Sequence, residues 1–313
     1  MNLQALLEAL SKDDALQHAC ENVQAGVYSR LALTPSATPY AVAALAHTTQ
    51  QSLVICATDR QAQDLTAQLQ DFFDSDEVVF FPSWETLPHE RLSPSGDTVG
   101  RRMAILHRLH TDADSIRIIV TTVRSVMQPM VQGLGQLEPV VVGQGQDISL
   151  GVLVEQLVAI GFERVDLVDR RGQVAVRGGI VDVFPADADH PVRIEFWGDA
   201  VEEIREFSVA DQRSIGNVSD PVRIVACREM LLTDAVRTRA EALADTHPDF
   251  SEMLNKIALG IPVEGMESLM SVLTPNLETL FDVLDKRCAV IEVDPERIEA
   301  RADELVSTSA EFL

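Results

Sequence analysis

The stretch RLALTPSATPYAVAALAH, residues 30–47, holds an apolar run, a proline turn and an alanine-rich segment in that order. The apolar run predicts a strand over 29–33, and the alanine-rich segment predicts a helix over 38–47. In nucleotide-hydrolysing α/β domains, this first strand, turn and helix carry a glycine-rich phosphate loop. Here the turn contains Pro35 and Pro39 and no glycine, so backbone N–H groups that phosphate would need are missing.

The same alternation of apolar runs and amphipathic segments continues to about residue 142. Helices are predicted over 60–73, with Asp59 as the N-cap, and over 98–110. Further strands are predicted over 52–57, 77–81, 116–121 and 139–142. Strands that alternate with helices form a largely parallel sheet with helices on its faces. The fold class is therefore predicted to be α/β, with a degenerate P-loop NTPase-like domain at the start of the chain.

The pattern changes after Gly143. A predicted helix over 149–162 leads into closely spaced strands, which indicate an antiparallel sheet in a small α+β domain. These strands are predicted over 164–168, 173–184, 191–197 and 200–207.

The remaining residues are mainly helical, with strand-like runs at 222–226 and 288–293. We expect 288–293 to return to the first sheet, so that the middle domain is an insertion. The predicted division is thus 1–142, 143–216 and 217–313.

Composition argues against several functions. The net charge is −24, whereas direct nucleic-acid binding needs clustered basic residues. The chain has no Gly-Lys dipeptide and four scattered cysteines, and its histidines lack metal-ligand spacing apart from the weak pair His107 and His110. We therefore expect no ATPase activity, cofactor or metal, and no membrane span because no apolar run is long enough. Scattered reduced thiols are typical of a cytoplasmic protein.

The stretch VRIEFWG, residues 192–198, carries the most informative side chains. In a strand, Val192, Ile194 and Phe196 point to one face, and Arg193, Glu195 and Trp197 point to the other.

Arg177 precedes Gly178-Gly179, a plausible bulge, and a hairpin would bring it near this row. Tryptophan with arginines is the composition of interface hot spots. Alternatively, Trp197 packs under the first helix of its domain and the charges pair within the chain.

Four segments together resemble the N-terminal part of the bacterial transcription-repair coupling factors (Mfd), a part that is itself similar to the repair helicase subunit UvrB. They are residues 81–109, 161–185, 190–214 and 265–273. The resemblance covers most of the chain, and it implies a fragment of a longer protein. UvrB has a working P-loop and a tyrosine-rich hairpin that clamps DNA, and this chain lacks both.

The resemblance implies that the middle domain binds UvrA. By motif position, the UvrA-binding residues fall on Arg177, Arg193 and Trp197, and the UvrB pattern adds Arg164 and Glu195. One departure is Ala175, where UvrB has another arginine.

The implied function is a non-catalytic module that recruits UvrA to stalled RNA polymerase in nucleotide excision repair. RNA polymerase and DNA would be bound by other domains of the longer protein, which would be an ATP-dependent translocase. The alternative is an autoinhibitory or structural domain that contacts the rest of its own chain.

Overall fold

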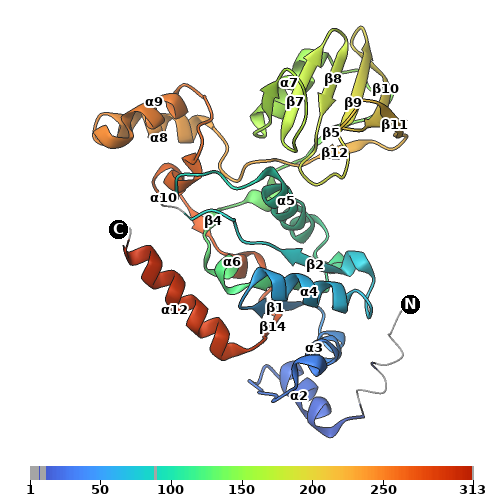
Figure 1. Ribbon diagram of the computed structural model, residues 1–313, viewed down its shortest axis with the longest axis vertical. Coiled ribbons are helices and arrows are strands. Elements are labelled where there is room, and N and C mark those ends of the chain that lie inside the picture. The colour runs from blue at the N-terminus through green and yellow to red at the C-terminus, as the bar shows by residue number, and fades with distance from the viewer. Residues whose placement is uncertain (1–6, 8–11, 88–89, 312–313) are drawn as a thin grey trace. The chain divides into compact units, whose positions relative to one another are not determined.

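The computed structural model describes residue 7 and residues 12–87 and 90–311. The chain divides into two compact units, each formed by discontinuous segments (Figure 1). Unit 1 comprises Met1–Ser83, Arg108–Pro129 and Glu278–Leu313, and unit 2 comprises Trp84–His107 and Met130–Leu277. The helix α5, Gly96–Thr111, begins in unit 2 and ends in unit 1.

Unit 1 is built on a four-stranded parallel sheet in the order β14-β1-β3-β2. Its strands are β1 (Ser52–Cys56), β2 (Val78–Phe81), β3 (Ile118–Thr122) and β14 (Ala289–Glu292). The apolar side chains of β1 and β3 are buried with those of the helices α3 and α4, because both helices turn an apolar face to the sheet. The helices are α2 (Asp14–Gln24), α3 (Thr38–His47), α4 (Asp59–Leu69), α6 (Val123–Met127), α11 (Leu280–Val283) and α12 (Pro295–Glu311).

Most strands of unit 1 follow the sequence-based prediction, and the run 288–293 does return to this sheet as β14, parallel to β1. The predicted strand over 29–33 is wrong. That segment has no helix or strand assignment, and no backbone hydrogen bond joins it to a described strand. The apolar run therefore predicted a strand, but the segment has no strand to pair with among the described residues.

The predicted N-cap of α4 also needs correction. Thr58, not Asp59, is the N-cap, since the Thr58 hydroxyl accepts a hydrogen bond from the Gln61 N–H at 3.3 Å. Asp59 is instead the first helical residue, where its negative charge interacts favourably with the positive end of the helix dipole.

Unit 2 contains a six-stranded sheet in the order β11-β10-β9-β8-β7-β6. Neighbouring strands are antiparallel except β6 and β7, which are parallel. The helix α7, Leu150–Ala159, packs its apolar side chains on one face of this sheet. The strands are β6 (Glu163–Val165), β7 (Gln173–Arg177), β8 (Ile180–Val183), β9 (Val192–Trp197), β10 (Ala200–Phe207) and β11 (Ser214–Asn217).

Two predictions in this unit need correction. The run 173–184 is not one strand, because the chain reverses at Gly178-Gly179 and forms the hairpin β7–β8. The strand predicted over 139–142 exists as β5 (Val140–Val142), but it pairs antiparallel with β12 (Val222–Ile224) instead of joining the parallel sheet. Val142 and Ile224 are buried in the same core as α7, which explains the pairing.

The rest of unit 2 is mainly helical and has its own apolar core, which includes Trp84 and Met230. Its helices are α8 (Asp234–Ala244), α9 (Ser251–Ala258) and α10 (Met270–Leu273), and short strands lie at β4 (Met130–Val131) and β13 (Leu277–Glu278). The three-part domain division stays a prediction. None of the described helices combines the length and apolarity needed to cross a membrane.

Candidate interaction surface

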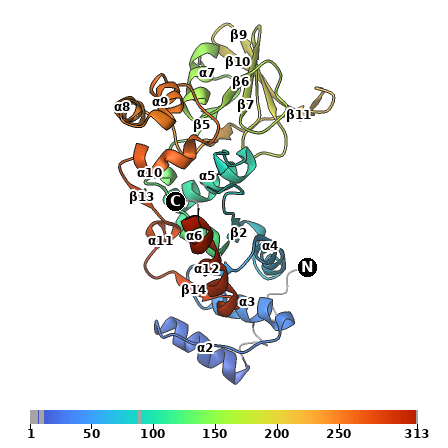
Figure 2. The same cartoon turned by 60° about the vertical axis from the view of Figure 1, so that its left-hand side comes forward.

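The strand β9 lies in the six-stranded sheet of unit 2 (Figure 2). Its residues alternate between a buried and an open face of that sheet. Val192 and Ile194 are 4% and 0% exposed and lie in the core under α7, whereas Trp197 is 80% exposed. The alternation predicted from VRIEFWG is confirmed. The alternative in which Trp197 packs under a helix does not describe this structure.

The strand register brings Arg177, Ile180 and Glu195 into a row across the open face. Arg177 on β7 lies opposite Ile180 on β8, and Ile180 lies opposite Glu195 on β9. Trp197 follows Glu195 by two positions, so it continues the same face. The Phe196 N–H donates to the Gly179 carbonyl at 2.8 Å, which fixes the end of β9 beside the β7–β8 turn. Arg177 and Trp197 therefore flank the same turn.

The turn has this form because of its glycines. Gly178 has a φ of +60°, a conformation that glycine adopts without the strain that a side chain would bring. A Cβ on Gly179 would lie 3.2 Å from the Phe196 carbonyl oxygen, closer than ordinary contact. The dipeptide Gly178-Gly179 thus allows the hairpin to approach β9 closely.

Arg193 lies on the open face but is held by neighbours. Its Nε donates to Asp182 Oδ1 at 2.7 Å and its Nη2 donates to Asp182 Oδ2 at 2.9 Å. The guanidinium carbon also lies 4.6 Å from the centre of the Phe207 ring. The hydrogen bonds to Asp182, more than the opposing effect of burial, raise the pKa of Arg193. Arg193 is therefore a fixed part of the face rather than a free cation.

Glu195 is also paired within the face. It accepts a hydrogen bond from Arg205 on β10, and the Arg205 Nε lies 3.5 Å from a carboxylate oxygen of Glu203. Arg205 lies opposite Arg193, so it is the diagonal neighbour of Glu195, and diagonal pairs of opposite charge are within reach of long side chains. The Glu195 carboxylate is therefore paired with Arg205. The expectation that charges pair within the chain thus applies to Arg193 and Glu195.

Arg177 and Trp197 differ from these paired residues. Among the residues that the structure describes, neither side chain has a hydrogen-bond or ion-pair partner, and both are exposed. We call these two residues the Trp197–Arg177 corner. An uncommitted guanidinium and an exposed indole can bind a partner without first breaking a contact inside the chain.

Arg164 is placed apart from the other predicted site residues. It lies opposite Val174 in the β6–β7 pairing, and Val174 is buried in the core under α7. Since opposite residues share a face, Arg164 projects from the α7 side of the sheet at its edge strand. The structure thus brings together Arg177, Arg193, Glu195 and Trp197 but not Arg164.

Sequence reasoning missed two residues of this face, Asp182 and Arg205. Asp182 is 3% exposed in the middle of β8, and a buried carboxylate needs a partner such as Arg193. Its signal was present, because an acid inside the apolar run IVDV stands out. Arg205 could be found only with the register of β9 and β10.

The described part of the chain shows no group of three or more histidine, cysteine, aspartate or glutamate side chains that could hold a metal ion. The face described above consists instead of paired charges beside a free indole and a free guanidinium. Such an arrangement is suited to binding another protein.

Comparison with protein families matches residues 140–229 to the UvrB interaction domain. This segment contains the six-stranded sheet and every residue of the predicted site. The segment also contains the two-stranded sheet β5–β12, whose Val142 and Ile224 lie in the same core as α7.

Comparison with curated proteins finds transcription-repair coupling factors. The protein of Mycobacterium bovis is 46% identical over 276 residues, which are 83% of this chain and 22% of the relative. The protein of Myxococcus xanthus is 33% identical over 250 residues, 74% of this chain and 21% of the relative. That of Bacillus subtilis is 25% identical over 301 residues, 90% of this chain and 25% of the relative. The chain therefore spans about a fifth to a quarter of the length of these relatives.

Proposed function

We propose that this chain, which belongs to the transcription-repair coupling factor family, is a non-catalytic module that recruits UvrA to stalled RNA polymerase. The observation that carries the proposal is the Trp197–Arg177 corner, which lies inside the segment matched to the UvrB interaction domain. A role in coupling transcription to excision repair follows from the family, and UvrA is the partner that the domain's relationship to UvrB suggests.

The corner would supply the centre of the interface. Tryptophan and arginine are enriched among residues whose truncation costs an interface most. Trp197 offers a large apolar surface that becomes buried, and Arg177 can bind a carboxylate through two parallel hydrogen bonds. Arg193 and Glu195, which are already paired, would shape the surrounding rim.

The test is a calorimetric titration of purified UvrA into the chain. Because truncation of a hot-spot residue costs about 2 kcal/mol or more, Trp197→Ala or Arg177→Ala should weaken binding about thirtyfold. Arg60→Ala is the matched control, since Arg60 is an arginine of α4 whose side chain is 94% exposed. UvrA that binds the Trp197→Ala and wild-type chains equally well would refute the assignment.

A second function uses the same corner. In the longer protein, this face could contact another part of its own chain and keep the module masked until that contact opens. The titration above distinguishes the two functions, because an autoinhibitory face without UvrA affinity gives no binding in the isolated chain. RNA polymerase and DNA would be bound by parts of the longer protein beyond this chain.

Unit 1 fits a degenerate P-loop NTPase-like domain. Its sheet is parallel, and the turn Pro35–Ala37 precedes α3 where a phosphate loop would lie. Pro35 in that turn and Pro39 in the first turn of α3, with no glycine or lysine among residues 35–40, leave few groups to bind phosphate. We expect ATP titrated into the chain to produce no binding heat, and tight ATP binding would contradict the assignment.

A further inference from the structure

The hairpin β9–β10 carries Trp197 at its tip. Trp197 pairs with Ala200, so the turn consists of Gly198 and Asp199. The pairing of β9 with β8 ends at Glu195, so the tip of the hairpin extends past β8. A two-stranded ribbon is only marginally stable without a further neighbour. The tip therefore depends on another segment to hold one position.

That segment is the chain that enters the small domain, residues 144–148, which we call the entry strap. It runs antiparallel to β10, on the side of β10 opposite to β9. The Gly145 N–H donates to the Val201 carbonyl at 2.8 Å, and the Val201 N–H donates to the Gln146 carbonyl at 3.0 Å. β11 pairs with β10 from Arg205 onward. The entry strap thus occupies the first part of β10, which β11 leaves open.

The entry strap also reaches the turn itself. The Ile148 N–H donates to the Asp199 carbonyl at 2.8 Å. On the other side of the hairpin, the Phe196 N–H donates to the Gly179 carbonyl at 2.8 Å. The backbone that carries Trp197 is therefore held from both sides.

Gln146 fixes the shape of the entry strap. Its side-chain Oε1 accepts a hydrogen bond from the Gly143 N–H at 3.0 Å, and its own N–H donates to the Gly143 carbonyl at 3.2 Å. These two bonds close the turn 143–146. Val142 before this turn is buried in the core under α7, and Ile148 after it packs against the same core. Gln146 therefore connects the anchored chain to the strap that holds the hairpin.

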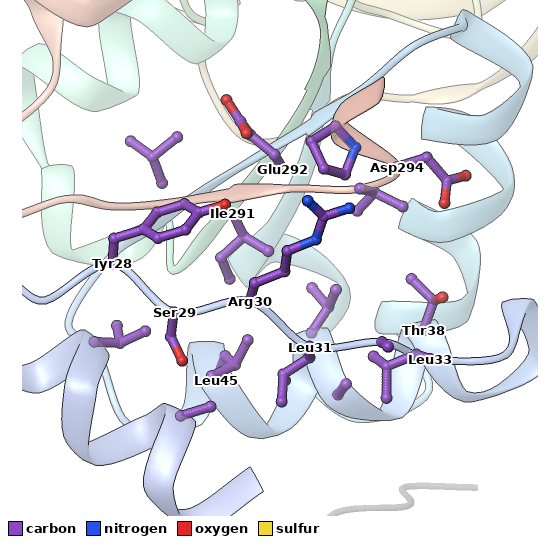
Figure 3. Close-up of a pocket in the computed structure, with 18 of the residues that line it drawn as sticks. Tyr28, Ser29, Arg30, Leu31, Leu33, Thr38, Leu45, Ile291, Glu292 and Asp294 are labelled. Carbon is purple, nitrogen blue, oxygen red and sulfur yellow. The ribbon is translucent and has the colours of Figure 1, made fainter. Parts of the chain in front are cut away.

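Tyr28 of unit 1 is also an exposed aromatic residue, but its backbone is held differently. It is 79% exposed on the segment 28–33, which lines a cavity of about 490 Å³ beside β14 (Figure 3). No backbone hydrogen bond joins this segment to a described strand, and Arg30 holds it through an ion pair with Glu296. What distinguishes Trp197 is thus the hydrogen-bonded backbone beneath it as well as its exposure.

We propose that the entry strap positions Trp197 for the partner, with Gln146 as the positioning residue, an inference that rests on the proposed function. An indole that already has its bound position loses less conformational freedom when UvrA binds, and affinity rises accordingly. Gln146 acts through the strap and the turn and does not itself touch the partner. A loosened strap would leave Trp197 as exposed as before but less precisely placed.

The first test is a calorimetric titration of UvrA into strap variants. Gln146→Ala removes the oxygen that closes the turn and should weaken binding about fivefold, the size of one lost hydrogen bond. Gln146→Glu keeps an acceptor at that place and should bind within about twofold of wild type. Gln70→Ala is the matched control, because the Gln70 side chain also donates to backbone carbonyls, those of Ser75 and Val78, but lies in unit 1. This control should leave binding unchanged.

The second test measures the position of the turn without UvrA. NMR relaxation of the Gly198 and Asp199 amides should give order parameters near about 0.85 in the wild-type chain and in Gln146→Glu, and lower values in Gln146→Ala. A role of Gln146 in overall stability alone would not loosen this turn selectively. A circular-dichroism melt of each variant checks that it remains folded.

Wild-type affinity of Gln146→Ala would overturn the proposal, and so would unchanged order parameters in its turn. If Trp197→Ala still weakens binding in that case, the UvrA assignment stands and only the role of the strap fails. If Trp197→Ala instead binds UvrA as the wild-type chain does, the UvrA assignment fails. The order parameters then decide separately whether Gln146 positions the turn.

Discussion

Arg193 and Asp182 form a two-pronged ion pair across β9 and β8, with N–O distances of 2.7 and 2.9 Å. The Asp182 side chain is 3% exposed, and the Arg193 side chain is 18% exposed. The pair therefore separates the arginines of the open face into two kinds. Arg193 maintains the sheet, whereas Arg177 remains available to a partner.

This division predicts different effects for two alanine substitutions. Arg193→Ala leaves the Asp182 carboxylate buried without its counter-ion, so the free energy of unfolding should fall by about 3 kcal/mol. Arg177→Ala removes an exposed side chain and should change that free energy by less than about 0.5 kcal/mol. Urea unfolding followed by circular dichroism measures both, and equal losses would show that Arg193 is not structurally committed.

A second buried ion pair makes a stronger prediction. The side chains of Arg102 and Glu229 are both 0% exposed, and the Trp84 Nε1–H also donates to Glu229 at 2.9 Å. Glu229→Gln removes the negative charge and leaves the Arg102 guanidinium buried, which should lower the free energy of unfolding by about 3–5 kcal/mol. Replacing both residues with apolar ones of similar size, as in Arg102→Met with Glu229→Leu, should recover most of that loss. A double variant less stable than Glu229→Gln would contradict this expectation. It would show that the ion pair contributes more to the free energy of unfolding than well-packed apolar side chains do.

Gly265 is predicted to tolerate no side chain. It has a φ of +73°, and a Cβ there would lie 2.1 Å from the Arg91 carbonyl oxygen. Gly265→Ala should therefore destabilise unit 2 by more than about 2 kcal/mol, through left-handed strain and steric overlap together. Gly145→Ala is the control, since Gly145 has a φ of +80° with no atom within 4 Å of the added Cβ and should cost only about 1 kcal/mol. Thermal melts that shift equally for the two variants would argue against the close approach at Arg91.

The buried thiols predict a loss of stability in alkali. Burial raises the pKa of both Cys56 and Cys227 to about 12, whereas an unfolded thiol ionises at about 8.5. Between these values the unfolded chain loses protons that the folded chain keeps. Their contribution is therefore complete below about pH 8 and is lost as the pH rises toward about 12.

Urea midpoints measured at about pH 7 and about pH 10 test this expectation. The variant with both Cys56→Ala and Cys227→Ala should show a smaller decline in unfolding free energy between the two pH values than wild type does. A decline of the same size in both proteins would assign the alkaline loss to other groups.

Local patterns predicted much of this molecule. Alternation along VRIEFWG placed Ile194 inside and Trp197 outside, because a strand has a period of two whatever surrounds it. Strand pairing was harder to predict. The runs at 29–33 and 139–142 both had strand composition, yet the first pairs with no described strand and the second pairs antiparallel with β12. Which strand a given strand pairs with depends on residues far away in the sequence.

The site shows the same limit. Sequence alone singled out Arg177, Arg193 and Trp197, but it could not tell a free arginine from a paired one. That distinction depends on Asp182, which faces Arg193 only after β8 and β9 come into register. Likewise, Arg164 belongs to the opposite face because the register of β6 on β7 places it opposite Val174, which is buried under α7.

The order of the chain has a consequence for biosynthesis. Ser52 on β1 lies opposite Ala289 on β14, and all of unit 2 lies between them in the sequence. When β1 leaves the ribosome, its outer neighbour has not yet been translated, so the nascent sheet must persist with β1 exposed until the whole insertion has emerged. Such long-range pairing slows folding, and the outer edge of β1 stays unpaired for as long as the intervening residues take to be translated.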